Sequence, residues 1–293
     1  MANKKGVIII NAYSSLASSV NQATRLKEEF EYLGVNIDIK RNVEFSSMVK
    51  GGKLASGFLD YDFCVYLDKD KYVSEILEKL GMRLFNKHDA IRVCDDKMRT
   101  YIALANNGVK VIDTIPGALC YTEDAIVQNA ELNKIINELG LPMVVKQNYG
   151  SLGKGVYKVE TFEELNLLAN KLKMTEHLFQ KMITTSIGRD IRVIVIGKKV
   201  FACMERVSKT DFRSNIELGG EGKPFDLPIS FVDVAEKVAT LLDLDYCGID
   251  ILIGENNEPI VCEVNSNAFF GGIESVTNKN VAKAYAEYIL NNI

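Results

Sequence analysis

The chain has 293 residues, of which 47% are hydrophobic and 25% are charged, a composition typical of ordinary soluble globular proteins. This length exceeds what one hydrophobic core usually serves, so two or three domains are expected. The formal net charge is −4 and opposite charges are interspersed. This excludes a broad basic surface for nucleic acid, and any anion must be bound by local groups.

The first apolar run stops at Ile10, which is too short for a signal-peptide core or a membrane span. A cytoplasmic protein with no membrane partner is therefore expected. The six cysteines include no C-x-x-C pair, which argues against a disulfide framework. His88 and His177 are far apart and match no catalytic triad or metal spacing.

The first third of the chain alternates short β-branched strands with amphipathic helices. Strands are expected at 7–10, 35–40 and 63–67, and helices from 14 or 15 to 32 and at 73–80, each helix being followed by a glycine. This order predicts a small parallel α/β domain. A further helix with Asp96 and Lys97 is expected to end near Gly108, and Ile115-Pro116-Gly117 marks a domain boundary.

The remaining segments alternate helices with strands and hairpins. We expect helices at 123–139 and 162–172, with strands at 143–147, 156–159 and 178–182. From Gly188 onward we expect a hairpin turning at Gly197-Lys198, a helix at 232–242, a second hairpin at 248–265 and a final helix.

The second hairpin carries three oxygen-bearing side chains. Alternation along the strand puts Glu263 and Asn265 on one face. If 255–258 form a four-residue loop, Gly254 pairs with Pro259 and Asp250 lies opposite Glu263. Two carboxylates and an amide, with no histidine or cysteine beside them, suit a hard cation such as Mg²⁺. The alternative is the solvated face of an ordinary hairpin. The opposite faces are expected to enter a core; they carry Ile249, Ile251 and Ile253 on one strand and Ile260, Cys262 and Val264 on the other.

A strand that carries Lys146 leads into a loop with glycines at 150, 153 and 155. Glycines allow backbone N–H groups to curl around an anion, and a lysine adds a point charge for phosphates. The segment differs from the G-x-x-x-x-G-K-[ST] phosphate loop because a strand, not a helix, follows it. A plain hairpin turn is the alternative.

Three runs between the lysine strand and the second hairpin resemble a known family. They are Gly188-Arg189-Asp190-Ile191-Arg192-Val193, Met204-Glu205-Arg206 and Asp211-Phe212-Arg213-Ser214-Asn215. Together with the two strand motifs, they are similar to the ATP-grasp ligases, and specifically to the RimK-like branch that joins glutamate or a similar amine to a carboxylate. The resemblance covers nearly the whole chain.

This resemblance implies an ATP-grasp fold in three parts. A Rossmann-like parallel α/β domain would occupy 1–88, and a central α+β subdomain with a glycine-rich lid would occupy 89–187. A C-terminal α+β subdomain with the metal-binding hairpin would occupy 188–293. The two α+β subdomains would hold ATP between them.

The resemblance also implies roles for individual residues. Lys97 and Lys146 would bind phosphates, and the hinge at 179–183 would meet adenine. The residues implied for ATP are Lys97, Lys146, Gly150, Ser151, Gly153, Gly155, Gln180, Lys181, Met182, Ile183, Asp190, Arg213, Ser214, Asn215 and Leu252. Asp250, Glu263 and Asn265 would bind Mg²⁺, with two ions expected and Mn²⁺ as the alternative metal.

Arg192, Arg206 and Arg213 are the catalytic candidates. The reaction would convert a carboxylate into an acyl phosphate, from which an amine displaces phosphate. Since the first step brings two anions together, an arginine could hold the transferring phosphoryl group or the oxyanion. Arg192 is favoured over Arg206 because it lies beside Asp190 in the most specific run. A surface ion pair is the alternative for each arginine.

Two segments depart from the family pattern. Lys181 stands where the family usually has a hinge glutamate, so adenine recognition there would depend on the backbone. After Asn265 the family commonly continues Ala-Ser-Pro, whereas this chain has Ser266-Asn267-Ala268-Phe269-Phe270. Asn267, Phe269 and Phe270 are therefore candidate substrate residues and suggest a changed substrate. Core packing is the alternative for at least one phenylalanine.

The expected function is an ATP-dependent carboxylate–amine ligase, with glutamate as the family's usual amine. The donor would be the carboxylate of a small molecule or of a protein C-terminus. The alternatives are an ATP-grasp ligase for another amino acid or peptide, and a non-catalytic ATP-binding module. A complete metal face argues against the latter. The family resemblance also implies a homodimer or homotetramer.

Overall fold

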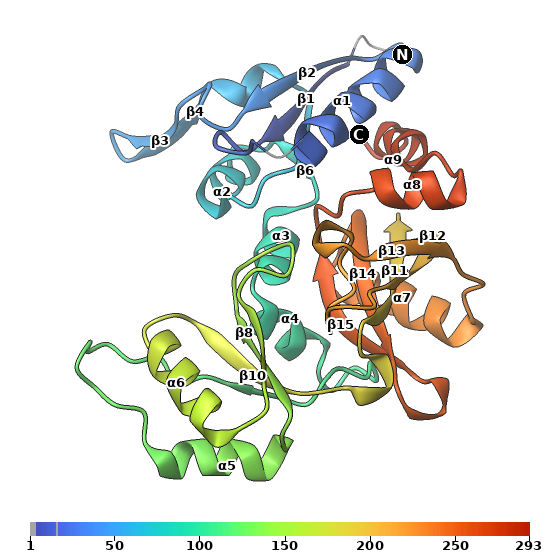
Figure 1. Ribbon diagram of the computed structural model, residues 1–293. Helices are drawn as coiled ribbons and strands as arrows, with labels where there is room; N and C mark the ends of the chain where they lie inside the picture. Colours follow the sequence, from blue (N-terminus) through green and yellow to red (C-terminus); the bar gives the residue numbers. More distant parts are fainter. Residues whose placement is uncertain (1–3, 16) are drawn as a thin grey trace.

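The computed structural model describes residues 4–15 and 17–293. Three sheets of four or five strands follow one another along the chain, and a two-stranded hairpin projects from the first of them (Figure 1). None of the helices in this described part is long and apolar enough to cross a membrane.

The N-terminal unit is a parallel four-stranded sheet in the order β2-β1-β5-β6. Its elements are β1 (Lys5–Ile10), α1 (Ala17–Tyr32), β2 (Asn36–Arg41), β3 (Ser47–Lys50), β4 (Lys53–Ser56), η1 (Gly57–Asp60), β5 (Phe63–Tyr66), α2 (Lys71–Lys79) and β6 (Arg83–Phe85). Alternate residues of β1 enter two cores: Ile8 and Ile10 pack with α1, and Val7 and Ile9 pack with α2. The sheet is thus buried on both faces, which confirms the predicted parallel α/β domain.

The helix predicted around Asp96 is in fact two helices, α3 (His88–Asp95) and α4 (Lys97–Leu104). Asp96 has extended backbone, and its side chain accepts hydrogen bonds from the backbone N–H groups of Met98 and Arg99. An aspartate that caps a helix in this way ends the preceding one. Buried residues of α3 and α4 pack into the core of the third sheet, although the predicted boundaries place them in the central unit.

The central unit is an antiparallel sheet in the order β7-β10-β8-β9, with α5 and α6 against it. Its elements are β7 (Thr114–Pro116), α5 (Asn129–Leu139), β8 (Met143–Gln147), β9 (Val156–Val159), α6 (Phe162–Leu172), β10 (His177–Lys181) and η2 (Thr184–Ser186). The prediction of a helix from 123 was wrong. Lys173 donates to the carbonyl oxygens of Glu123 and Ala125, and Asn170 accepts from the Val127 N–H, so side chains hold this segment as a loop.

The C-terminal unit is an antiparallel sheet in the order β13-β12-β11-β14-β15. Its elements are β11 (Arg189–Ile196), β12 (Lys199–Val207), η3 (Ile216–Leu218), β13 (Glu221–Pro224), α7 (Ile229–Leu241), β14 (Tyr246–Ile253), η4 (Glu255–Asn257), β15 (Pro259–Asn265), α8 (Gly271–Thr277) and α9 (Val281–Leu290). Helix α7 covers one face. On the other face, Ile194, Phe270 and Tyr285 share one core with Ile8 and Phe30 of the N-terminal unit.

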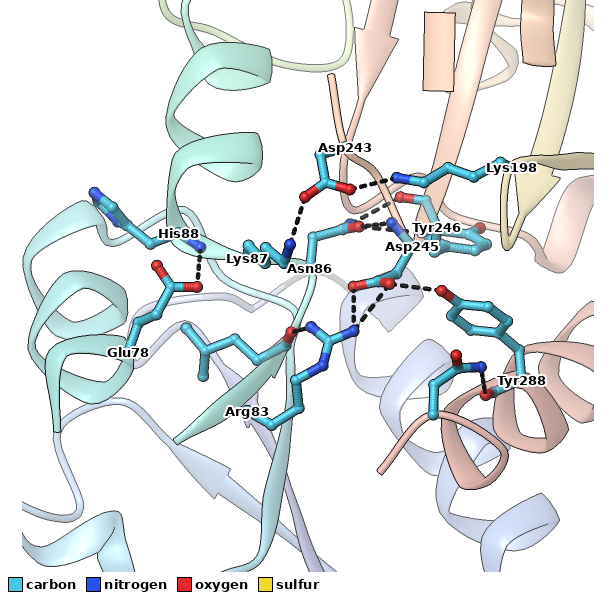
Figure 2. Close-up of polar contacts among 12 residues, drawn as sticks. Glu78, Arg83, Asn86, Lys87, His88, Lys198, Asp243, Asp245, Tyr246 and Tyr288 are labelled. Atoms are coloured by element: carbon cyan, nitrogen blue, oxygen red, sulfur yellow. Dashed lines mark hydrogen bonds and ion pairs between the residues drawn. The ribbon is translucent and has the colours of Figure 1, made fainter. Parts of the chain in front are cut away.

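Polar contacts reinforce the junction between the first and third units (Figure 2). Arg83 forms an ion pair with Asp245, and Lys87 forms one with Asp243. Asn86 is 1% exposed and donates to the carbonyl oxygens of Tyr246 and Ser266, at 2.8 and 2.9 Å. The junction therefore fixes the start of β14 and the segment that follows β15.

Candidate active site

The hairpin of β14 and β15 brings Asp250 opposite Glu263, as predicted. The predicted loop was wrong, because Ile253 and not Gly254 pairs with Pro259. A bulge between Asp250 and Ile251 restores the register. Cys262 consequently does not enter the core as predicted. Its sulfur lies 3.6 Å from Lys146 Nζ, while the neighbouring Val261 is buried in the core instead.

Asp250 lies in a buried cluster with Asp190, Arg192 and Arg206. Arg192 Nη2 and Arg206 Nη2 each lie 2.9 Å from Asp250 Oδ2, and Arg206 Nε donates to Asp190 Oδ1 at 2.7 Å. Burial disfavours the charge of Asp250, but the two arginines outweigh it and lower the pKa of this carboxyl group. Burial raises the pKa of Asp190 despite its pairing with Arg206. The formal charges of the four side chains cancel, so the cluster can remain ionised out of water.

Glu263 and Asn265 have fewer polar partners than Asp250. The Glu263 side chain is 26% exposed, and its nearest cation is Lys97 Nζ, 3.6 Å away. In the described ranges no group of three or more histidine, cysteine, aspartate or glutamate side chains is arranged to hold a metal ion. Asp250, Glu263 and Asn265 bring together two carboxylates and one amide, and these all-oxygen donors fit Mg²⁺. In this structure the Asp250 carboxylate is paired with Arg192 and Arg206.

A small cavity of about 110 Å³ lies between the central and C-terminal units. It is lined by most residues predicted to bind ATP, namely Lys97, Lys146, Gly150, Ser151, Gly153, Gln180, Lys181, Met182, Ile183, Asp190, Arg213, Ser214, Asn215 and Leu252, together with Asp250 and Glu263. Gly155 is absent from this described lining, because its position is packed against Gln147. Cys262, Val144, Ile112 and Phe212 also line the small cavity and were not predicted.

Lys146 is suited to an anionic ligand. It is buried on β8, and a thiol, that of Cys262, is the hydrogen-bond partner of its ammonium group among the described residues. Burial acts to lower the pKa of Lys146, but Cys262, Tyr101 and Glu263 outweigh it and the pKa is raised. The ammonium group has three N–H donors, and phosphate oxygens would accept those that Cys262 does not.

The predicted hinge also fits a nucleotide. Gln180 is 1% exposed and donates to Thr114 Oγ1 at 2.8 Å, while its Oε1 has no hydrogen-bond partner in the described part of the chain. An unpaired buried acceptor beside a cavity suits a donor such as an exocyclic amine. Lys181 also lines the cavity, and its Nζ lies 3.8 Å from Asp113 Oδ2.

The glycine loop is held over the small cavity from three sides. Lys97 Nζ donates to the Gly150 carbonyl oxygen at 3.0 Å, and Arg213 Nη1 donates to that of Gly153 at 2.7 Å. Lys69 of the N-terminal unit donates to Ser151 Oγ at 3.0 Å. Gly153 has φ +73°, a left-handed conformation that favours glycine.

A large cavity of about 620 Å³ lies between the N-terminal and C-terminal units. Its lining includes the predicted Arg192, Arg206, Glu263, Asn265, Asn267, Phe269 and Phe270. Phe270 is also buried in the shared core, whereas Phe269 is half-buried. Sequence reasoning missed the N-terminal contributors, including Asn11, Arg25, Asp68 and Lys69. Their one available signal was their position near the carboxyl ends of parallel strands and on the following helix.

The two cavities meet at Ser151, Asn215 and Glu263, which line both. A ligand in the small cavity would therefore end beside a ligand in the large cavity. The arrangement can hold a polyanion on lysines, a divalent cation on carboxylate and amide oxygens, and a second molecule next to both.

Two α+β units that close on a lysine-lined cavity, behind a parallel α/β unit, define the ATP-grasp class. A family model described as the RimK-like ATP-grasp domain matches residues 94–289. The chain therefore belongs to the RimK-like ATP-grasp family.

Two human proteins are similar in sequence. N-acetylaspartylglutamate synthase A of Homo sapiens is 35% identical over 232 residues, covering 77% of this chain and 57% of that protein. Beta-citrylglutamate synthase B of Homo sapiens is 37% identical over 227 residues, covering 76% and 57%. The chain thus spans less than two thirds of the length of these relatives.

Two solved structures share the fold at low sequence identity. D-alanine–D-alanine ligase from Bacillus anthracis, complexed with ATP, has a TM-score of 0.75 and 18% identity, covering 98% of this chain and 96% of that chain. The ATP-grasp ligase PsnB, complexed with minimal precursor, Mg and ADP, has a TM-score of 0.69 and 16% identity, covering 98% and 97%. These likenesses establish the ATP-grasp fold.

Proposed function

We propose that this chain is an ATP-dependent ligase that joins a carboxylate to an amine through an acyl phosphate, with L-glutamate as the amine. The observation that carries the proposal is the meeting of the two cavities at Glu263, with buried lysines on one side and arginines on the other. Family membership supports the same chemistry. The names of both human relatives contain glutamate, which supports the choice of amine.

In this proposal the small cavity binds ATP. Lys146 and Lys97 hold phosphate oxygens, the glycine loop covers them, and the hinge at 180–183 receives adenine. Glu263 and Asn265 would hold Mg²⁺, with Asp250 directly opposite Glu263 on the neighbouring strand as the third oxygen ligand. When bound, Mg²⁺ neutralises charge on the phosphates and aligns them for attack.

Of the catalytic candidates, we propose that Arg192 holds the transferring phosphoryl group. Its guanidinium is shared with one aspartate, whereas that of Arg206 is shared with Asp190 and Asp250. Arg206 is then the residue that keeps Asp190 and Asp250 in place. Arg213 acts on the glycine loop through its contact with Gly153.

The large cavity holds the carboxylate donor and the amine. Asn267 and Phe269 shape it near Glu263, which supports a substrate different from that of relatives with Ala-Ser-Pro at this place. Two metal ions, with Mn²⁺ as the alternative to Mg²⁺, and a homodimer or homotetramer in the cytoplasm belong to the same proposal.

Hydroxamate formation tests the proposed function directly. The protein is incubated with ATP, Mg²⁺, hydroxylamine and a panel of donors that includes N-acetyl-L-aspartate, citrate, amino acids and short peptides. Hydroxylamine traps an acyl phosphate whatever the natural amine, so the coloured product and an equal release of ADP are expected with at least one donor. Binding of ATP with neither product, for any donor, would identify a nucleotide-binding module instead.

A further inference from the structure

Asp68 is a buried carboxylate in the wall of the large cavity. It follows β5 at the carboxyl edge of the parallel sheet and is 4% exposed. Asn11 Nδ2 and the Lys69 backbone N–H donate to its Oδ1 at 3.1 and 2.7 Å, and Asn42 Nδ2 donates to its Oδ2 at 2.6 Å. All three donors are neutral, so they orient the carboxylate without cancelling its charge.

The two amides are fixed with their N–H groups toward Asp68. Asn42 Oδ1 accepts the Ala12 N–H at 3.1 Å, and Asn11 Oδ1 accepts the Tyr13 N–H at 2.9 Å. Since each carbonyl oxygen is engaged by the backbone, each Nδ2 must face the carboxylate. The cluster is thus organised around an acceptor at position 68.

The charges around the large cavity leave Asp68 without a counterion. Four cations line it, and each has a carboxylate partner. Lys69 pairs with Asp95 at 2.6 Å, Arg25 pairs with Glu29 at 3.0 Å, and Arg192 and Arg206 pair with Asp250. The second carboxylate in the lining, Glu263, has Lys97. Asp68 makes no ion pair within residues 4–15 and 17–293.

A buried carboxylate without a cation is unfavourable, and burial accordingly raises the pKa of Asp68. A ligand ammonium in the large cavity would supply the missing charge. The position is suitable for the reaction, because Asp68 lines the same cavity as Glu263 and Asn265, and Asn267 Nδ2 donates to the Asp68 carbonyl oxygen at 2.9 Å.

We propose that Asp68 recognises the ammonium group of the amine substrate, an α-amino acid, in the large cavity. This inference rests on the proposed ligase function, which requires an amine next to the site where the carboxylate is activated. Asn11 and Asn42 are positioning residues that hold the Asp68 carboxylate for this contact.

Equilibrium binding tests the inference without turnover. Titration calorimetry compares L-glutamate with glutarate, which has both carboxylates but no ammonium group, and compares other L-amino acids with their des-amino counterparts. The wild-type protein is expected to prefer at least one amino acid by about 10- to 100-fold, the usual effect of one charge-assisted contact. The Asp68→Asn variant is expected to lose that preference while binding the des-amino compound as before.

Asp62→Asn is the matched control, because Asp62 precedes the same strand, accepts the Lys5 N–H at 2.7 Å and lies on the exposed surface. It should bind as the wild type does. If Asp68→Asn does not fold, as judged by thermal unfolding, Asp68→Ser replaces it. Equal affinity of the wild type for each amino acid and its des-amino counterpart overturns the inference without any variant, and so does an unchanged preference in the Asp68 variants.

The outcomes separate this inference from the proposed function. Hydroxamate formation without an ammonium preference would leave the ligase standing and overturn the role of Asp68. An ammonium preference that depends on Asp68, with no hydroxamate or ADP from any donor, would support the ammonium site and contradict the ligase.

Discussion

At the scale of single residues, the candidate site is a balance of buried charges. The ammonium group of Lys146 has only a thiol as its hydrogen-bond partner among the described residues and can still bind an anionic ligand. The carboxylate of Asp250, in contrast, is paired with Arg192 and Arg206. Glu263 stands between these two environments and lines both cavities. Replacing it therefore tests the site with little effect on the buried cluster.

Glu263→Gln should abolish Mg²⁺-dependent turnover, with a loss of at least about 10²-fold, because removal of one such electrostatic group usually costs this much. The fold should persist, since the amide has the same shape and its nearest cation, Lys97, lies 3.6 Å away. ADP release is measured against Mg²⁺ concentration, with thermal unfolding as the check on folding. Glu258→Gln on the same hairpin, outside both cavities, is the control. Normal turnover in Glu263→Gln would remove the metal assignment.

At the scale of elements, the sequence predicted the strands around the site better than the loops. The pairing of Asp250 with Glu263 follows from alternation and hairpin geometry, so it could be predicted. The bulge and the exit of Cys262 from the core could not, because they depend on how β15 pairs with β14 and on the contact of Cys262 with Lys146 of the central unit. The break at Asp96 had a local signal, because an aspartate before a helical run is a typical helix N-cap.

The residues of the large cavity were the least predictable. Asn11 and Asp68, which line it, and Asn42, which donates to Asp68, come from the ends of three different strands and form no motif along the chain. Only the parallel sheet brings them together. The ATP-binding candidates were predictable because the family resemblance preserves their order, and all but Gly155 line the small cavity.

The glycine loop is the element with the clearest mechanical requirement. An alanine at Gly153 would adopt φ +73°, at a cost of about 1–2 kcal/mol, and its Cβ would lie 2.8 Å from Leu218 Cδ1. Gly153→Ala should therefore displace the loop and lower kcat about 10-fold or more, since small misplacements of this kind reduce the rate strongly.

ATP and Mg²⁺ should also protect amides 150–155 from hydrogen exchange in the wild type, and less so in the variant.

Gly81→Ala is the control for this prediction. Gly81 has φ +92°, and nothing lies within 4 Å of a Cβ built there. It carries similar backbone strain far from both cavities, so it should lower stability and leave kcat unchanged. Equal exchange across 150–155 with and without nucleotide would contradict a mobile lid.

At the scale of the whole molecule, the N-terminal and C-terminal units share one hydrophobic core and a polar junction (Figure 2). Because the large cavity lies between these units, the junction determines its shape. The contacts at the junction differ in burial and therefore in their expected contribution to stability. The Asp243 side chain is exposed to solvent, whereas Asn86 is fully buried.

Asp243→Asn should have a small effect that depends on pH. Hydrogen bonds from Lys198 and Lys87 lower the pKa of Asp243 below its ordinary 3.8. A lowered folded-state pKa means that the stabilisation is complete above the unfolded-state pKa and is lost as the pH falls through the folded-state pKa. With the side chain 58% exposed, solvent screening limits the effect to about 0.2–1 kcal/mol. Urea unfolding should show this difference at pH 7 and none near pH 2, whereas a constant difference at both would refute the ionic origin.

Asn86→Ala should have a much larger effect. Asn86 Oδ1 accepts the N–H groups of Asp245 and Tyr246 at 2.6 and 3.1 Å, and its Nδ2 donates to two further backbone carbonyl oxygens. Alanine would leave four buried backbone groups without partners, and each such loss costs about 1–3 kcal/mol. The free energy of unfolding should fall by at least about 3 kcal/mol in urea titrations. The control is Asn107→Ala, which changes an exposed asparagine. Its side chain bonds only within its own turn, and its loss should cost under about 0.5 kcal/mol.

Because one core spans both units, the wild type should unfold them together. Two separate transitions, or a loss below about 1 kcal/mol in Asn86→Ala, would show that the junction does not couple them.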